Sequence, residues 1–595
     1  MIITSELARD AEQSKSVEKK TDFHVLEDSE TQSPRIGLAL SGGGFRAAIF
    51  HLGVIRRLEE LGLMSRVRVV SAVSGGSIIA AYYLCEMERR LRLEKPGVQD
   101  CRETRVRIYD KIAHDFFEAL DNNLRTRALI FTPFHHPWLF IKTLALKAFR
   151  AGARSELIQC EYDRWFYHNN TLDQLPGAVQ REGGEGADTA REKSTGSRLL
   201  INTTSLLTGE RVAFCREPIS RVNEMSRVNN NVLPLSRVVG ASSGVPGLFP
   251  PTMISGDVLV DGGVADNQGI ESLIEDPMDC NLLLVSDASG QMEPIHTIKE
   301  GTFKVLSRVN SIFQFQIRNK LLDILVGWKR LPELRKTHKE PHEFAFVHLH
   351  LNLKDRLQAT NRIPSEFIPG IARIRTDLDQ FSHVEREALM YHGYTLIDAQ
   401  LKEYCPRLLP ELQGESSVPA MTVPPLFQEE VLVSCTNRDK IRAELEAGST
   451  NFYLARCLKK YPLRAGSILA AGCGMVLALS FFIFLVYPQW VERLGDRLAG
   501  FFMGLIPDMW VLPVSGFLEA RGLLDVETTV RGLSGLGAIA GIILLIGYIT
   551  AFPVYLAMRR TVSSLDRHGY KKLTGIEPSI HWTSRSEGGH QENSG

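Results

Sequence analysis

Three short glycine-containing motifs hold the residues of this chain that could carry out covalent chemistry. SGGGFR begins at Ser41, AVSGGS places Ser74 before two glycines, and DGG begins at Asp261. The first two motifs each follow an apolar run and precede a helix-like segment, so both are expected at strand ends that face one crevice. A serine next to an anion-binding turn is typical of a serine hydrolase.

The first motif predicts an oxyanion-binding turn. Gly42, Gly43 and Gly44 lack β-carbons, so their backbone can turn sharply and expose N–H groups at a helix N-terminus. The same run also matches the G-x-G-x-x-A form of a dinucleotide fingerprint, which ends at Ala47. A dinucleotide site needs an acidic residue at the end of the next strand, whereas that strand ends in Ser-Ala-Val-Ser at Ser74. The oxyanion interpretation is therefore favoured.

Ser74 lies in a small-x-Ser-x-Gly sequence, which is typical of a nucleophile elbow. Such a turn is strained and needs small neighbours, and here Gly76 follows on one side while Ala72 stands where the usual pattern has glycine. An isolated Ser-Gly-Gly is more often an ordinary loop. Here the preceding strand pattern favours a nucleophile elbow over an ordinary loop. Ala72 makes the turn more crowded than the usual glycine would.

The serine hydroxyl needs a base within hydrogen-bond reach. Asp261 follows the apolar run DVLV and precedes two glycines, so its carboxylate is expected at a strand end with room for a substrate. Three nearby aspartates are rivals whose ordinary role is turn capping or solvated charge: Asp257, Asp266 and Asp287. Four downstream histidines lack a convincing catalytic setting: His296, His348, His350 and His383. A Ser/Asp dyad is the better hypothesis.

Taken together, these motifs resemble those of the patatin-like phospholipases. The resemblance spans about Arg35 to Asp287 and also includes Ile201–Phe214, which resembles a strand pair of the family, and the proline-containing segment Ala241–Pro251. The chain departs from the family pattern at Ala72 and at Gly244, where the family has glycine and alanine.

The resemblance implies a lipid acyl hydrolase of the phospholipase A or lysophospholipase type, which works through a Ser/Asp dyad and an acyl-enzyme. It implies no histidine in the relay, no metal and no cofactor. The implied fold is a three-layer α/β/α domain with a central, mostly parallel sheet. The residues it assigns are Ser74 and Asp261 as catalytic groups, Gly42, Gly43 and Gly44 as the oxyanion hole, and Arg46, Gly76 and Gly262 as supporting residues.

Short apolar runs that alternate with helical patterns predict one α/β domain to position these residues. The expected strands are IGLAL, VRVVSAV, RLLINTTSL, DVLVDGG and NLLLVSD. The aromatic and basic segment Arg127–Arg150 suits either a membrane interface or a core-packed helix pair. Gln180–Ser197 has no apolar periodicity and predicts a surface loop.

Two uncharged runs, Ala465–Tyr487 and Gly532–Met558, are long enough to cross a bilayer as helices. A buried soluble helix is the weaker alternative for two such runs. Basic residues precede the first run and follow the second, which by the positive-inside rule predicts both ends of the hairpin in the cytoplasm. We therefore expect an integral membrane protein with a cytoplasmic catalytic domain.

These patterns divide the chain into five parts. They are a disordered tail over 1–34 without a signal sequence, a catalytic domain over 35–405, a linker with short helices over 406–460, a transmembrane hairpin over 461–560 and a cytoplasmic tail over 561–595.

Composition limits the partners and the alternatives. Sixty-nine basic residues equal 69 acidic ones, which argues against a nucleic-acid binder, and nine scattered cysteines argue against a disulfide framework or a zinc site. A lipid bilayer and a membrane phospholipid or other lipid ester are the expected partners, and oligomeric state has no sequence signal. Two alternatives stay open: acyl transfer or peptide hydrolysis on the same elbow, and a catalytically silent membrane module if Ala72 prevents the elbow from forming.

Overall fold

The structure is a computed structural model, and the parts of the chain that it describes are residues 34–94, 101–130, 152–176, 180–181, 192–193, 196–216, 233–275, 280–290, 302–331, 341, 343–353, 363–405, 408, 420–449 and 554–578, with isolated positions at 467, 470, 471, 474 and 478.

The strands are β1 Ile36–Leu40, β2 Val67–Val73, β3 Gln180–Arg181, β4 Glu192–Lys193, β5 Arg198–Ser205, β6 Arg211–Phe214, β7 Thr252–Ile254, β8 Asp257–Asp261, β9 Leu282–Asp287 and β10 Glu343–His348. The α-helices are α2 Gly44–Glu60, α3 Gly75–Leu93, α4 Arg102–Leu120, α5 Leu124–Ile130, α8 Gly152–Tyr162, α9 Leu235–Ser242, α10 Glu271–Ile274, α11 Thr302–Arg330, α12 Ile368–Ala372, α13 His383–Tyr404, α15 Glu429–Leu432 and α16 Cys435–Ala447. Shorter helical turns are η3 Met64–Arg66, η4 Asp163–Tyr167, η5 Leu172–Gln174, η8 Gly262–Val264 and η11 Pro425–Phe427.

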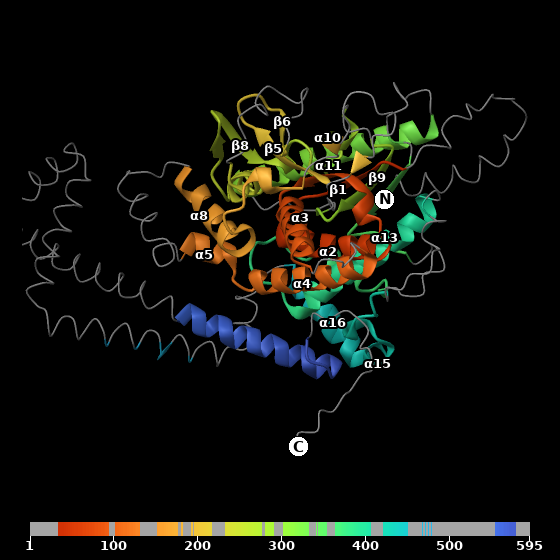
Figure 1. Ribbon diagram of the computed structural model, residues 1–595. Helices are drawn as coiled ribbons and strands as arrows, with labels where there is room; N and C mark the ends of the chain where they lie inside the picture. Colours follow the sequence, from red (N-terminus) through yellow and green to blue (C-terminus); the bar gives the residue numbers. More distant parts are fainter. Residues whose placement is uncertain are drawn as a thin grey trace, which may run out of the picture. The chain divides into compact units, whose positions relative to one another are not determined.

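A mixed eight-stranded sheet forms the centre of the fold (Figure 1). Its order is β10-β9-β1-β2-β5-β8-β7, with β6 also paired to β5. The pairs from β10 to β5 are parallel, and the pairs that involve β6, β7 and β8 are antiparallel. All five strands expected from apolar runs are present, so the predicted α/β fold is confirmed, with a sheet that is parallel at its centre and antiparallel towards one edge.

Helices cover both faces of this sheet (Figure 1). Alternate residues of β1 and β2 belong to two different cores, because successive side chains of a strand point to opposite faces. Leu38 and Val70 pack with α2, α3, α4 and α13, whereas Ala39 and Val69 pack with α10 and the C-terminal half of α11. The predicted three-layer α/β/α arrangement follows from this division.

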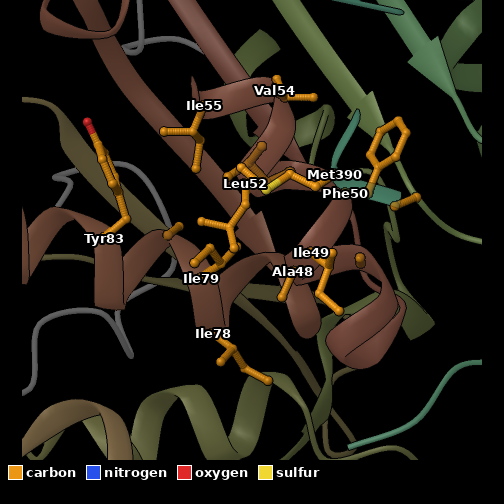
Figure 2. Packing of buried hydrophobic residues seen from close by; sticks show 14 of the residues in the cluster. Ala48, Ile49, Phe50, Leu52, Val54, Ile55, Ile78, Ile79, Tyr83 and Met390 are labelled. Atoms are coloured by element: carbon orange, nitrogen blue, oxygen red, sulfur yellow. The ribbon is translucent and has the colours of Figure 1, made fainter. Parts of the chain in front are cut away.

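Helix α2 lies between α3 and α13 in the larger core, and Figure 2 shows its side chains packed against Ile79, Tyr83 and Met390. The crossing of α2 and α13 is close enough to require glycine on both helices. A β-carbon on Gly53 would lie 1.8 Å from the Met390 carbonyl oxygen, and one on Gly393 would lie 2.2 Å from the Phe50 carbonyl oxygen.

Several predictions fall on residues outside the described ones. This holds for the tail over 1–33, for most of Gln180–Ser197, where only the short β3 and β4 pair is described, for 131–150 of the aromatic and basic segment, and for both apolar runs except isolated positions and residues 554–558. No helix among the described residues is both long and apolar enough to span a bilayer. Arg127, at the start of the aromatic and basic segment, is buried and pairs with Glu161 at 3.1 Å, so this residue belongs to the core.

The end of the second apolar run and the residues after it form a helix that packs on the α/β domain. This helix, over residues 554–574, crosses the domain boundary predicted at 560 and packs against the start of α13. The His383 N–H donates to Asp566 at 3.1 Å, and the Tyr570 hydroxyl donates to Glu387, whose pKa burial raises to about 7. The helix continues past the predicted boundary because it has an apolar face that packs on the domain. Four residues at helical spacing on this face are buried: Tyr555, Met558, Val562 and Tyr570.

The end of α16 meets the same region of the fold. The Gly448 carbonyl, which caps α16, accepts a hydrogen bond from the Arg375 N–H at 3.2 Å. The segment just before α13 therefore contacts both the residues that precede 449–553 and the helix that follows them.

The crossing of α2 and α13 gives a stability prediction. Gly53→Ala should lower the free energy of unfolding by about 2 to 3 kcal/mol, because the added methyl group forces the two helices apart. Gly569→Ala is the matched control: its β-carbon would meet no atom within 4 Å, so the higher helix propensity of alanine should leave stability unchanged or raise it by up to about 1 kcal/mol. Thermal and denaturant unfolding of the full chain in detergent measure both; equal effects of the two substitutions would contradict the prediction.

Candidate active site

Ser74 lies on a strained turn between β2 and α3, as the elbow hypothesis requires. Its backbone has φ 49° and ψ −114°, a conformation that residues with side chains rarely adopt. The Ser74 N–H donates to the Ser242 hydroxyl at 3.0 Å, which holds the turn. Ala72 is buried within β2, and its carbonyl accepts a hydrogen bond from the Asn202 side chain at 3.0 Å. The elbow therefore forms with alanine at this position.

The elbow and the first glycine turn contact each other through their backbones. A β-carbon on Gly75 would lie 2.1 Å from the Gly44 carbonyl oxygen, and one on Gly76 would lie 2.3 Å from the Leu40 carbonyl oxygen. The Gly76 N–H donates to the Ser41 carbonyl at 3.1 Å. Only glycine leaves room for this approach, and the approach brings the oxyanion turn next to the serine.

Two of the three turn glycines can serve an oxyanion. The Gly42 N–H already donates to the Asn267 carbonyl at 3.0 Å, so the place of Gly42 in the turn is set by packing: a β-carbon there would lie 2.4 Å from the Asn267 side chain. Gly43 and Gly44 have positive φ values of 139° and 59° and line the same pocket as Ser74 at the start of α2. Among the residues that the structure describes, no acceptor engages either amide, and both lie where the helix dipole favours negative charge.

Asp261 ends β8 and lines the same pocket as Ser74. Its carboxylate accepts a hydrogen bond from the Gly263 N–H at 2.7 Å. Burial raises the pKa of Asp261 to about 6, although the Gly263 N–H and the nearby Ser74 hydroxyl act in the opposite direction. Gly262 is required beside it, since a β-carbon would lie 2.3 Å from the Asn202 carbonyl oxygen. A carboxylate with a pKa near neutrality, in the same pocket as a serine hydroxyl, is suited to act as a general base.

The rival aspartates have structural partners instead. Asp257 accepts a hydrogen bond from the Ser205 hydroxyl at 2.8 Å. Asp266 accepts three backbone N–H bonds that hold the loop before α10. Asp287 pairs with Arg318 at 3.0 Å. Of the four candidate histidines, His296 lies outside the described residues, and none of the other three lines the pocket at Ser74.

A histidine that the sequence did not suggest, His51, forms a hydrogen bond with the first glycine turn. His51, buried in α2, donates from Nε2 to the Ser41 carbonyl at 3.0 Å, which leaves Nδ1 to accept from the Ser286 hydroxyl at 2.8 Å. Burial lowers its pKa to about 4, so the ring is neutral and keeps this tautomer at physiological pH. His51 therefore ties the turn to β9 and does not contact the pocket. Its place in an apolar helical pattern gives no sequence signal.

Ser74 and Asp261 line a pocket of about 220 Å³ together with Gly43 and Gly44. Arg46 also lines it and donates to the Ile374 carbonyl at 2.7 Å; burial lowers the pKa of its guanidinium to about 10, with Asp287 opposing the shift. The Phe45 N–H donates to the Asp377 carbonyl at 2.8 Å, so the segment before α13 braces the oxyanion turn at two points. In the described part of the chain, side chains arranged to hold a metal ion lie on α4, outside this pocket: His114, Asp115 and Glu118.

Comparisons with known proteins give one family model and several solved structures. The family model "Patatin-like phospholipase" matches residues 38–274. A comparison with curated protein sequences gives no match. Among solved structures, human GIVD cytosolic phospholipase A2 in complex with methyl gamma-linolenyl fluorophosphonate is 14% identical, with a TM-score of 0.34 over 64% of this chain and 59% of that one. VipD from Legionella pneumophila is also 14% identical, with a TM-score of 0.25 over 95% of this chain and 94% of that one.

The buried carboxylate of Asp261 makes a stability prediction with a defined pH window. Because its folded pKa of about 6 exceeds the unfolded value of 3.8, the folded state binds more protons, and stability is lost as pH rises through this window. Asp261→Asn removes that cost and should raise the free energy of unfolding at pH 8 by on the order of 1 to 3 kcal/mol. The gap between variant and wild type should close below pH 4. Unfolding measured at both pH values tests this, and a gap independent of pH would contradict it.

Proposed function

Because residues 38–274 form a patatin-like phospholipase domain, we propose that this chain is a lipid acyl hydrolase of the phospholipase A or lysophospholipase type. The observation that carries the proposal is the position of Ser74, on its strained turn, in one pocket with the buried carboxylate of Asp261. The pocket around them is mainly apolar at one side, where Val245, Leu248 and Phe249 line it, which suits an acyl chain.

The proposed reaction uses these groups in two steps. Ser74 Oγ attacks the ester carbonyl carbon while Asp261 accepts the hydroxyl proton, and the negative charge that forms on the carbonyl oxygen is stabilised by the Gly43 and Gly44 amides. When the tetrahedral intermediate breaks down, the C–O bond to the leaving alcohol cleaves and Asp261 returns the proton to that alcohol. Water then attacks the acyl-enzyme with Asp261 again as base, which releases the fatty acid and regenerates Ser74.

We further propose that the two apolar runs anchor this domain to the bilayer that holds its substrate, with the domain and both termini in the cytoplasm. The support is the absence of charge in both runs and the basic residues that flank them. An anchored enzyme meets its lipid at a high effective concentration, so it needs little affinity for free lipid. Access of added protease to the C-terminal tail from the opposite side alone would contradict this orientation.

A fluorophosphonate probe tests the nucleophile. Wild-type protein should be labelled covalently and should release fatty acid from mixed membrane lipids, and Ser74→Ala should do neither, with hydrolysis reduced at least about a thousandfold. Ser243→Ala is the matched control, since Ser243 lines the same pocket but its hydroxyl donates to the Val239 carbonyl at 2.8 Å. Labelling of Ser74→Ala, or no labelling of either folded protein, would reject the proposal. Acyl transfer in place of hydrolysis would appear as an acylated alcohol among the products.

The pH profile tests the base. Asp261 must be ionised to accept the proton, so kcat/KM should rise with pH through a midpoint near 6 and level off above about pH 7. Asp261→Asn should lose activity at every pH while the protein stays folded. A profile in wild type without an inflection between pH 5 and 7, or retained turnover in the variant, would remove Asp261 from the role of base.

A further inference from the structure

Helix α11 has an exposed apolar half next to the pocket. Its C-terminal half packs on the sheet through the buried Leu321 and Leu325. Its N-terminal half exposes five large apolar side chains: Val305, Leu306, Val309, Ile312 and Phe313. Leu306 and Phe313 are each 61% exposed, which is uncommon for two leucine- or phenylalanine-sized side chains on one helix face of a soluble domain.

The same helix forms part of the pocket wall. Asn310 and Gln314 line the pocket that contains Ser74 and Asp261. In a helix, positions 306, 310, 313 and 314 share one face, because residues three, four, seven and eight apart are neighbours. Leu306 and Phe313 therefore lie on the face of α11 that turns towards the site, and any lipid chain that reaches Asn310 and Gln314 passes close to them.

A second segment adds to this apolar rim. Leu248, between α9 and β7, lines the same pocket and is 56% exposed. Leu248, Val245 and Phe249 come from a part of the chain distant from α11 in sequence, so the apolar rim is not a property of one helix alone. Exposed apolar side chains therefore lie beside the pocket on two segments, α11 and residues 245–249.

Charge on this part of α11 suits a membrane surface. The sequence from Val305 to Leu322 contains Arg308, Arg318 and Lys320 and no acidic residue. Arg318 points inward to Asp287, while Lys320 is exposed. An apolar helix face with one exposed lysine and no carboxylate over residues 305–322 suits contact with a bilayer that contains anionic lipids.

We propose that residues 305–313 of α11, together with Leu248, form the surface by which the catalytic domain enters the interfacial layer of a lipid bilayer, so that an acyl chain passes from the membrane along α11 to Ser74. This inference rests on the proposed lipid hydrolase function, and it adds where the membrane meets the site. It assigns Leu306 and Phe313 to membrane contact and leaves them out of the catalytic pocket.

A double variant, Leu306→Asp with Phe313→Asp, tests the surface in the full chain reconstituted in vesicles of phosphatidylcholine and phosphatidylserine. Hydrolysis of long-chain phospholipid in these vesicles should fall at least fivefold, while hydrolysis of a short-chain, water-soluble ester by the same preparation should stay within twofold of wild type. The matched control is Leu93→Asp with Val433→Asp, since both side chains are more than 70% exposed but do not line the pocket. An equal loss on both substrates, or no loss on vesicles, overturns the proposal.

A readout independent of activity separates this inference from the proposed function. Phe313→Trp in the inactive Ser74→Ala background should add fluorescence that lipids with brominated acyl chains quench, whereas Val433→Trp should add fluorescence that they do not quench. Quenching without any ester hydrolysis by wild type would support the surface and reject the lipid hydrolase. Unquenched fluorescence at position 313 overturns the surface, and a dimer in solution would then make it a contact between two copies of the chain.

Discussion

The site depends on the close approach of two peptide backbones at the carboxyl ends of β1 and β2. Parallel pairing aligns these strand ends, but a nucleophile and an oxyanion turn need a shorter separation than side chains allow. Gly75 and Gly76 remove the β-carbons that would meet the Gly44 and Leu40 carbonyls, and the Ser41 carbonyl then bonds to the Gly76 N–H. The strained backbone of Ser74 is held within this contact, so packing maintains its conformation.

Burial of ionisable groups around this contact sets their chemistry. Asp261, Arg46 and His51 are all buried, and each has a pKa displaced in the direction that favours its neutral form. For His51 the shift keeps a neutral ring that joins Ser41 to Ser286. For Asp261 the raised pKa costs stability at neutral pH, and under the proposed mechanism it gives the carboxylate a strength suited to a base.

Local sequence was enough to predict the strands and the motifs, because a short apolar run that ends at glycines rarely forms anything other than a buried strand. Contacts between residues far apart in the sequence could not be predicted from local patterns. His51 lies in an ordinary apolar helical pattern, and Asn267 follows the DGG motif with no feature that suggests a contact with the glycine turn. The Asp377 carbonyl, which accepts a hydrogen bond from the Phe45 N–H, lies more than 300 residues beyond Phe45 in the sequence. The assignment of Gly42 shows the same limit: its residue type fits an oxyanion turn, but its amide is already bonded to Asn267, which only the tertiary structure reveals. Likewise, the helix over 554–574 has an apolar face that local pattern assigned to the end of a hairpin and a tail.

The attachment of that helix and of α16 to one short segment has a mechanical consequence. Gly448 bonds to Arg375, and Ser563 and Asp566 accept hydrogen bonds from Gln380 and His383, so both ends of the chain between 449 and 553 are attached within a few residues of one another. The Asp377 carbonyl, which holds Phe45 and hence the oxyanion turn, lies between these two attachments in the sequence. Tension or displacement between the two ends would act on the oxyanion turn through this carbonyl, without any ligand or chemical modification as an intermediate.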